Sequence, residues 1–316
     1  MDVLTPEAAE HTRPALLRAL EAACPDGVAR DVDLAAMSRW RIGGRAAVVL
    51  RPESAAELAA VLRTVRAFRH PYVVIGSTSN LLFADEGLHA VCIQIGERLA
   101  DCTIAGEVVH AQSGAWVPGL ARRVMQADLT GAEHICGIPG TLGGLVCMNG
   151  GTKRKGIGDS VVEVTSVDRT GAIRVRPREA CGFAYRRSIF QTNGEIVVDV
   201  TLRFARAPER GTVRREMIEI LQSRRRRFPQ KWPNCGSTFV SDPAMYADYG
   251  PPGAVIERVG LKGMTRGDAE ISEQHANFIL NRGRATAADV LFLIRHIGDT
   301  VFERTGTGWQ PDETPV

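Results

Sequence analysis

The segment 135-ICGIPGTLGGLVCMNGG-151 contains six glycines and no charged side chain. So much glycine disfavours both a helix interior and a strand interior, because an ordered glycine loses more conformational freedom than any other residue. The segment is also too apolar for a flexible linker. Glycine allows positive φ and lets the backbone approach a flat or charged ligand closely. We therefore predict a ligand that is held largely by main chain; tight packing between two elements is the alternative.

A second segment, 75-IGSTSNLLFADEG-87, has a related character. A buried strand is predicted to lead into Gly76, and a polar turn then runs to Asn80. Successive backbone N–H groups in a tight turn form an anion-binding concavity, and the hydroxyls of Ser77, Thr78 and Ser79 would add donors. This pattern predicts a phosphate-binding turn; a solvated turn between strands is the alternative.

Composition limits the class of protein. The chain has 316 residues, 44% hydrophobic and 24% charged, which is ordinary for a globular protein of two or three domains. A net charge of +3 does not by itself indicate nucleic-acid binding. The seven cysteines are odd in number, and neither a C-x-x-C pair nor suitably spaced histidines accompany them, so we expect reduced thiols, no metal site and a cytoplasmic location. No apolar run reaches the roughly 18 residues of a membrane span, and the acidic N-terminus is unlike a signal peptide.

Hydrophobic periodicity predicts the elements before the glycine-rich segment. The clearest helix lies within 54–71, where Ser54 and Glu57 predict a capping box. Apolar residues recur on one face of that helix at Leu58, Val61, Leu62, Val65 and Phe68. Residues 1–30 are Ala-rich and are predicted to be helical in part. Strands are predicted at 46–50, 71–76, 90–96 and 108–114, and a helix at 115–128.

The second half predicts further α and β elements. Residues 161–177 predict a hairpin with its turn at Asp168–Gly171, and a strand at 195–205 should pair with it. We also expect a helix at 211–228, short strands around 269–280 and a helix at 286–304 that Thr286 and Asp289 cap. The predicted class is α+β, in three consecutive regions.

Seven motifs occur in an order that resembles the UDP-N-acetylenolpyruvoylglucosamine reductase family. They are IGG (42–44), GSTSNLL (76–82), SGA (113–115), GIPGTLGG (137–144), YRRSIF (185–190), NCGSTF (234–239) and HANFILN (275–281). The match covers nearly the whole chain. It implies an FAD-binding fold of the vanillyl-alcohol-oxidase type, with two subdomains, plus an α+β substrate-binding domain.

The resemblance also implies a domain order and a cofactor. An N-terminal extension (1–30) would precede FAD-binding subdomains at 31–90 and 91–205, and a substrate-binding domain at 206–316. FAD would be held non-covalently, with its pyrophosphate at the turn from Gly76 to Asn80. The implied cofactor-binding residues are Gly76, Ser77, Thr78, Ser79, Asn80, Gly114, Gly137, Ile138, Pro139, Gly140, Gly143 and Gly144.

The implied reaction reduces the enolpyruvyl ether of UDP-N-acetylglucosamine-enolpyruvate to UDP-N-acetylmuramate for peptidoglycan, with NADPH as the source of electrons. Arg186 occupies the family's catalytic arginine position, where a guanidinium can hold a carboxylate and stabilise an enolate. A surface arginine pair is the alternative, and it fits Arg187 better. Ser237 occupies the position of the proton-donating serine; an ordinary turn residue is the alternative.

Five residues would contact the substrate, a nucleotide sugar: Tyr185, Arg224, Arg227, His275 and Asn277. The two arginines belong to the run 224-RRRRFPQK-231, most of which must be solvated. The run lacks the interleaved aromatic residues of a single-strand nucleic-acid platform. We therefore expect no nucleic-acid partner. We also expect no membrane partner, since no apolar run is long enough to span a membrane, and we expect a monomer.

The C-terminus departs from the family pattern. The family's catalytic glutamate aligns with Asp312, one methylene shorter, and Glu313 follows it. Either residue substitutes for the glutamate, or the proton chemistry has changed. This departure motivates two alternatives: a paralogous flavin oxidoreductase acting on another nucleotide or sugar, and a non-catalytic flavin- or nucleotide-binding protein. Arg186 and Ser237 argue against the second.

Overall fold

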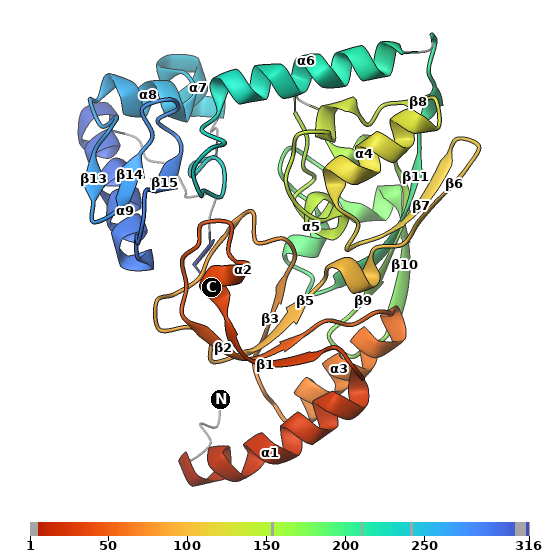
Figure 1. Cartoon of the computed structure of the whole chain (residues 1–316). Helices are drawn as coiled ribbons and strands as arrows, with labels where there is room; N and C mark the ends of the chain where they lie inside the picture. Colours follow the sequence, from red (N-terminus) through yellow and green to blue (C-terminus); the bar gives the residue numbers. More distant parts are fainter. Residues whose placement is uncertain (1–5, 153–154, 210, 241–242, 307–313, 316) are drawn as a thin grey trace. The chain divides into compact units, whose positions relative to one another are not determined.

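The computed structural model describes residues 6–152, 155–209, 211–240, 243–306 and 314–315 (Figure 1). The chain forms two compact units. The first comprises Met1–Arg30, Ala47–Gly76 and His89–Leu221, and the second Asp31–Ala46, Ser77–Leu88 and Gln222–Val316. Each unit is therefore assembled from segments that are distant in sequence. No helix among the described residues is both long enough and apolar enough to cross a membrane.

Helices α1 (Pro6–Ala23) and α3 (Ala55–Ala67) accompany a four-stranded sheet that lies mostly in the first unit (Figure 1). Its strands are β1 (Val28–Asp33), β2 (Arg45–Leu50), β5 (Val91–Gln94) and β3 (Tyr72–Ile75), in that spatial order, with β2 and β3 parallel to β5. The apolar face predicted for α3 is buried at Leu58, Val61, Leu62 and Val65. Phe68 ends the helix and is only partly buried.

The cap of α3 differs from the prediction in one bond. The Ser54 hydroxyl accepts from the Glu57 N–H at 3.1 Å, as expected. The Glu57 carboxylate, however, accepts from the Glu53 N–H at 2.9 Å rather than from Ser54. The predicted capping box required the Glu57 carboxylate to accept from the Ser54 N–H. This part of the prediction is wrong, because the carboxylate accepts from the preceding residue instead.

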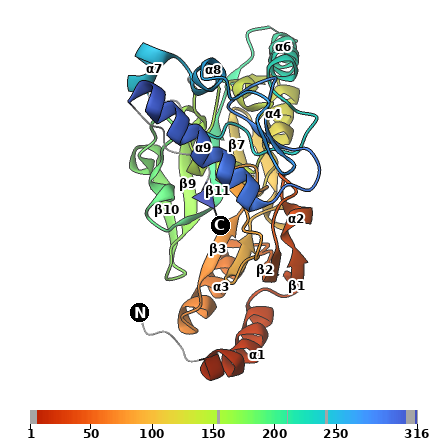
Figure 2. The same ribbon diagram turned by 90° about the vertical axis from the view of Figure 1, so that its left-hand side faces the viewer.

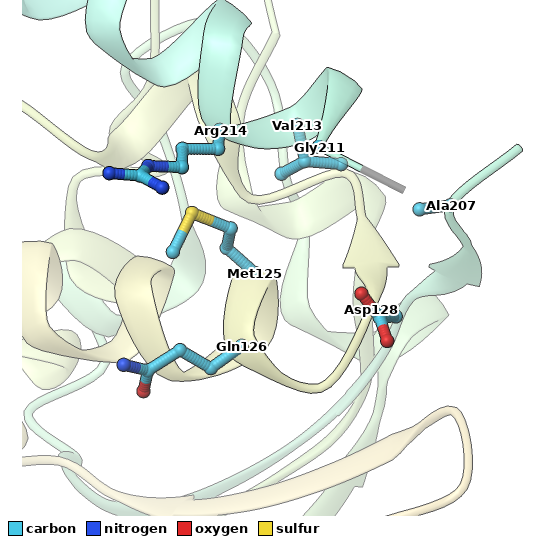
Figure 3. Close-up of a pocket in the computed structure, with 7 residues that line it drawn as sticks. All are labelled: Met125, Gln126, Asp128, Ala207, Gly211, Val213 and Arg214. Atoms are coloured by element: carbon cyan, nitrogen blue, oxygen red, sulfur yellow. The ribbon is translucent and has the colours of Figure 1, made fainter. Parts of the chain in front are cut away.

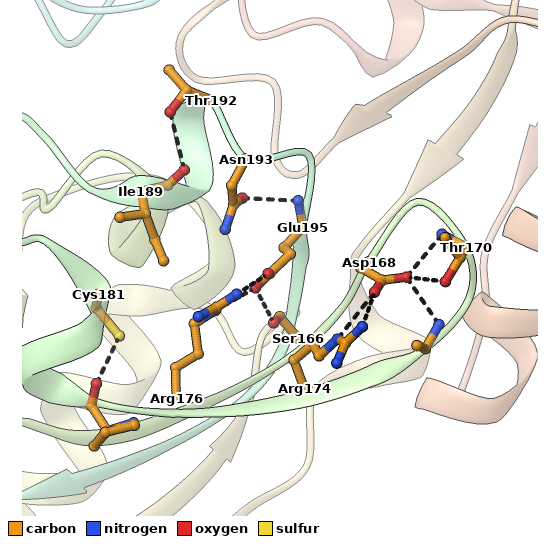
Figure 4. A network of polar contacts seen from close by, with 12 residues as sticks. Ser166, Asp168, Thr170, Arg174, Arg176, Cys181, Ile189, Thr192, Asn193 and Glu195 are labelled. Atoms are coloured by element: carbon orange, nitrogen blue, oxygen red, sulfur yellow. Dashed lines mark hydrogen bonds and ion pairs between the residues drawn. The ribbon is translucent and has the colours of Figure 1, made fainter.

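The larger sheet of the first unit is antiparallel throughout. Its order is β10 (Ile173–Pro177), β9 (Val161–Val167), β11 (Ile196–Arg203), β7 (Val108–Gln112) and β6 (Cys102–Ala105). The predicted hairpin and its pairing with β11 are confirmed. The Asp168 carboxylate closes the hairpin turn by accepting from the N–H groups of Thr170 and Ala172 (Figure 4). Strands β1 and β6 were not predicted.

A β-bulge in β11 lets this strand serve two cores. Its register against β9 shifts between Val197 and Asp199. A bulge reverses the alternation of side chains between the two faces of a sheet. Accordingly, Ile196 and Val198 belong to the core beneath α1 and α3. Val197, Val200 and Leu202 belong to a second core.

The second core is covered by α4 (Val117–Gln126) and α5 (Leu142–Cys147). The first unit also contains β8 (Leu129–Thr130), β12 (Ala205–Arg206), the beginning of α6 (Thr212–Arg227), and single 3-10 turns at Glu97–Leu99, Glu133–Ile135, Ile157–Asp159, Arg178–Cys181 and Ile189–Gln191.

The second unit packs short strands against α9 (Ala287–Thr305), the long blue helix of Figure 2. The Thr286–Asp289 capping box is present, as predicted. The Asp85 carboxylate also accepts from the Ala287 N–H at 2.7 Å. The sheet order is β13 (Thr265–Arg266), β14 (Ala269–Ile271) and β15 (Ile279–Asn281). Other elements are α2 (Leu34–Met37), α7 (Pro243–Tyr249), α8 (Pro252–Arg258), and β16 (Thr314–Pro315), which pairs in parallel with β4 (Leu81–Leu82).

Candidate functional site

The glycine-rich segment of the first unit is fixed through its main chain. Gly140 has φ +144°, a conformation that favours glycine, and its carbonyl accepts from the Val117 N–H at 3.0 Å. The Leu142 N–H donates to the Ala115 carbonyl at 2.9 Å. The predicted residues Gly137, Ile138 and Pro139 form the loop just before this anchored part.

One expectation about this segment is wrong. Residues 142–147 form helix α5 although two of the six are glycines. Leu142, Leu145 and Val146 are buried in the second core, and this packing outweighs the low helix propensity of glycine. Glycine is required there for space: a Cβ on Gly143 would lie 2.9 Å from the Cβ of Ser113.

Two other predicted glycines join this cluster in the first unit. A Cβ on Gly76 would lie 2.5 Å from the Thr141 hydroxyl oxygen. A Cβ on Gly114 would lie 1.9 Å from the Gly96 carbonyl oxygen. Gly76, Gly114 and Gly140–Gly144 therefore lie in closely packed chain, which agrees with the alternative of tight packing between two elements; ligand binding by these glycines stays a prediction.

An unpartnered hydroxyl supports a ligand at this cluster. Ser113 is fully buried, and its Oγ has no hydrogen-bond partner among the described residues. Leaving a buried hydroxyl unpaired costs about 1–3 kcal/mol. Ser113 precedes Gly114 and lies against Gly143, so its hydroxyl is the polar partner that a ligand at this cluster would meet. The residues present thus fit a flavin.

The turn from Ser77 to Asn80 belongs to the second unit. Thr78 has φ +53°, which is unusual for a β-branched residue and indicates a conformation held by its surroundings. Its hydroxyl accepts from the Arg39 N–H at 3.2 Å and donates to the Met37 carbonyl at 2.9 Å. That hydroxyl is therefore engaged, which corrects the expectation that it would donate to a phosphate.

The second unit brings this turn together with the NCGSTF motif. The Cys235 thiol lies 3.3 Å from the Thr78 carbonyl oxygen and 3.4 Å from that of Leu81. Gly236 follows with φ +94° and open space beside it. Ser237 is half-buried, and its hydroxyl has no hydrogen bond within the described part of the chain. The hydroxyl is thus available to a ligand.

Asn277 holds the Ser237 segment in place. Its carbonyl accepts from the Thr238 N–H at 2.9 Å. Its side-chain amide accepts from the N–H and donates to the carbonyl of Phe239, both at 2.9 Å. Asn277 is buried, and these bonds assign it a positioning role; substrate binding by Asn277 stays a prediction.

The remaining predicted substrate residues of the second unit gather around Phe228, a residue that was not predicted. The guanidinium carbons of Arg224 and Arg227 lie 4.9 and 5.4 Å from its ring centroid, and the His275 ring lies at 5.5 Å. Burial lowers the pKa of His275. Its Nδ1 accepts from the Asn277 N–H at 3.3 Å, which fits a neutral imidazole.

Tyr185 and Arg186 lie in the first unit, at a cavity of about 320 Å³. Arg186 has φ +53° and donates through Nη2 to the Gly151 carbonyl at 3.1 Å, and its guanidinium carbon lies 5.6 Å from the Tyr185 ring centroid. Lys155 and Arg178 add positive charge to the lining and Asp159 adds negative charge. The cavity is therefore suited to an anion. Arg187 is exposed, which agrees with its interpretation as a surface arginine.

Another cavity of the first unit, about 270 Å³, contains no predicted site residue (Figure 3). Its lining residues are Met125, Gln126, Asp128, Ala207, Gly211, Val213 and Arg214. Asp312 and Glu313 lie outside the described residues. Among the residues that are described, no group of three or more His, Cys, Asp or Glu side chains could hold a metal ion.

Comparisons with known proteins cover almost the whole chain. Residues 228–312 match the family model of the UDP-N-acetylenolpyruvoylglucosamine reductase C-terminal domain, and residues 46–175 match that of an FAD binding domain. The chain is 46% identical over 278 residues to UDP-N-acetylenolpyruvoylglucosamine reductase 1 of Corynebacterium glutamicum, covering 88% of this chain and 83% of the relative. It is 40% identical over 273 residues to the reductase of Heliobacterium modesticaldum, covering 86% and 85%. The crystal structure of the Thermus caldophilus reductase matches with a TM-score of 0.76 and 32% identity, covering 90% of this chain and 98% of that one.

Proposed function

Because the chain belongs to the UDP-N-acetylenolpyruvoylglucosamine reductase family, we propose that Arg186 and Ser237 carry its chemistry and that NADPH is its reductant. The protein is a flavin-dependent UDP-N-acetylmuramate dehydrogenase of peptidoglycan synthesis. Its fold is an FAD-binding domain of the vanillyl-alcohol-oxidase type with the family's C-terminal domain. The predicted family, fold and reductase activity are therefore confirmed, and neither alternative function is favoured.

The cofactor, when bound, supplies the two-electron chemistry that links NADPH to the enolpyruvyl double bond. Main chain at Gly76, Gly114 and Gly137–Gly144 would hold FAD non-covalently, with Ser113 Oγ as a polar partner. Main chain of the turn from Ser77 to Asn80 would hold the pyrophosphate. The predicted division into 1–30, 31–90, 91–205 and 206–316, the monomeric state and the cytoplasmic location remain proposals.

The side chains would act on the substrate in separate ways. The guanidinium of Arg186 pairs with the substrate carboxylate and stabilises the negative charge that develops as an enolate. The hydroxyl of Ser237 delivers a proton at C2. Tyr185, Arg224, Arg227, His275 and Asn277 would orient the nucleotide sugar. The observation that carries this proposal is Arg186 in its left-handed turn beside a cavity suited to an anion.

The test is an anaerobic assay of the purified holoenzyme. We expect NADPH oxidation to require UDP-N-acetylglucosamine-enolpyruvate and to form UDP-N-acetylmuramate in equal amount, with NADH a much poorer reductant. NADPH oxidation that proceeds as fast without the enolpyruvyl substrate would contradict the proposal. So would equal use of NADH.

Replacing Gly140 by valine should abolish flavin binding. Gly140 has φ +144°, and a valine side chain there would occupy space that we assign to the flavin. The measurement is the flavin content of the purified variant. Gly106→Val is a matched control, because Gly106 also has a positive φ, +63°, but lies in open space. Equal loss of flavin in both variants would show that backbone strain alone is responsible.

Asp312→Ala should slow substrate reduction by about a hundred- to ten-thousandfold, if Asp312 replaces the family's glutamate. Glu313→Ala should then have little effect, and Asp312→Glu should keep or raise the rate because the longer side chain restores the reach. Single-turnover rates of the three variants decide between the two acids. A loss confined to Glu313→Ala would transfer the role to Glu313.

A further inference from the structure

The turn that carries Arg186 needs external support. Ala184 and Arg187 exchange hydrogen bonds at 3.0 and 3.1 Å, so that Tyr185 and Arg186 form a two-residue turn. Arg186 is left-handed, with φ +53°. Such a conformation is unfavourable for an arginine and persists only where surrounding groups hold it. The groups that hold this turn therefore set where the guanidinium lies.

Asn149 contacts the turn at its first carbonyl. Its side-chain Nδ2 donates to the Ala184 carbonyl at 2.8 Å. Its Oδ1 accepts from the Gly158 N–H at 2.9 Å. A Cβ on Gly156 would lie only 2.4 Å from this oxygen, so the neighbouring chain is shaped around the amide. Asn149 is itself left-handed, with φ +41°, a conformation that asparagine tolerates better than most residues.

Gln191 contacts the same turn at Arg186 itself. Its Nε2 donates to the Arg186 carbonyl at 3.1 Å, and its Oε1 accepts from the Ser188 N–H at 3.3 Å. The Ser188 hydroxyl donates to the Cys147 carbonyl, at the end of α5. The Asn149 amide and the Ser188 hydroxyl thus tie the turn to the end of the glycine-rich segment, and Gln191 Nε2 also donates there, to the Met148 sulfur at 3.2 Å.

The connection from β10 to β11, residues 178–195, is an excursion that carries the Arg186 turn. A separate set of hydrogen bonds joins its two ends (Figure 4). Nε of Arg176 donates to Oε2 of Glu195 at 2.8 Å, and the Ser166 hydroxyl donates to the same oxygen at 2.7 Å. The hydrogen bond from Arg176 lowers the pKa of Glu195. This ion pair fixes where the excursion starts and ends, while Asn149, Gln191 and the bond from Arg186 Nη2 to the Gly151 carbonyl hold its tip.

We propose that Asn149 is a positioning residue for the reduction: its side-chain amide couples the end of the flavin-binding segment to the left-handed turn that carries Arg186. This inference rests on the proposed function of Arg186. Asn149 follows α5 by two residues. Its amide therefore links the segment proposed to hold the cofactor with the turn proposed to hold the substrate, and these two parts must keep a fixed relative position. Asn149 touches neither reacting group, and its effect passes through the Ala184 carbonyl.

Asn149→Asp is the most selective test. The carboxylate keeps an acceptor for the Gly158 N–H but cannot donate to the Ala184 carbonyl. A second variant, Asn149→Gly, removes both bonds without straining the positive φ. Asn193→Asp is the matched control, because it makes the same amide-to-carboxylate change in the same excursion, while Asn193 hydrogen-bonds the N–H and the side chain of Glu195 and not the turn of Tyr185 and Arg186.

The measurement is the single-turnover rate at which holoenzyme reduced with dithionite is reoxidised by UDP-N-acetylglucosamine-enolpyruvate. We expect Asn149→Asp and Asn149→Gly to slow this step by about a hundredfold, the typical result of a misplacement near 1 Å. Flavin content should stay at the wild-type level, as should the rate of Asn193→Asp. In an Arg186→Ala background, Asn149→Asp should cause no further loss, because the group it positions is gone.

Hydrogen exchange of the Arg187 N–H provides a readout that does not depend on Arg186 chemistry, and it should be faster in Asn149→Asp. The inference is overturned by unchanged exchange, by a wild-type single-turnover rate, or by losses that multiply in the double variant. If Arg186→Ala alone is fully active, the proposed role of Arg186 fails; faster exchange in Asn149→Asp would still support control of the turn by Asn149.

Discussion

Arg186→Ala is expected to lower the rate of substrate reduction by about a hundred- to a thousandfold, as removal of one group that stabilises developing negative charge does in other enzymes. The guanidinium is held in a left-handed turn beside a cavity whose lining includes Lys155 and Arg178. The loss should fall on the step after flavin reduction. Stopped-flow measurement of flavin reoxidation by the enolpyruvyl substrate records that step directly.

Two matched variants sharpen this prediction. Arg187→Ala removes an exposed arginine from the same turn and should leave the rate unchanged. Arg186→Lys keeps the charge but cannot form a forked pair with a carboxylate, so most of the loss should remain. Equal effects of Arg186→Ala and Arg187→Ala would mean that net positive charge, and not the guanidinium of Arg186, matters.

Ser237→Ala should slow the same step by about a hundred- to ten-thousandfold, the usual contribution of general acid catalysis. Flavin reduction by NADPH should be nearly unaffected, because only the later step needs a proton at C2. Ser237 follows a glycine at φ +94°, and Asn277 holds the next two residues through their main chain, so its hydroxyl has a defined position.

Separate measurement of the two half-reactions decides this case. Ser237→Thr keeps a hydroxyl and should retain more of the rate than Ser237→Ala. Equal slowing of both half-reactions, or of neither, would remove Ser237 from the proton transfer.

Local patterns predicted the elements whose burial follows from their own sequence. The α9 capping box and the β9–β10 hairpin are of this kind, because cap, turn and periodicity lie within one segment. Helix α5 could not be predicted in the same way. Its buried leucines and valine pack in a core that other segments complete, and this packing overrides the cost of two glycines.

The candidate site shows the same difference between what local sequence predicts and what depends on distant segments. Arg186 and Ser237 were predicted because the order of motifs resembles a family, whereas the glycines were predicted from the glycine-rich segment itself. The roles of Asn149 and Gln191 depend on bonds to segments that the sequence does not place nearby. The Asn–Gly pair at 149–150 is a turn signal that could have indicated the positive φ of Asn149, but not its bond to Ala184.

The bulge in β11 bears on how the first unit denatures. Ile196 and Val198 line one core, while Val197, Val200 and Leu202 line the other. If this strand detached, both cores would be exposed to water at once, so neither can melt while the other stays intact. The first unit should therefore lose its structure in a single cooperative step, and its two sheets should not behave as independent folding units.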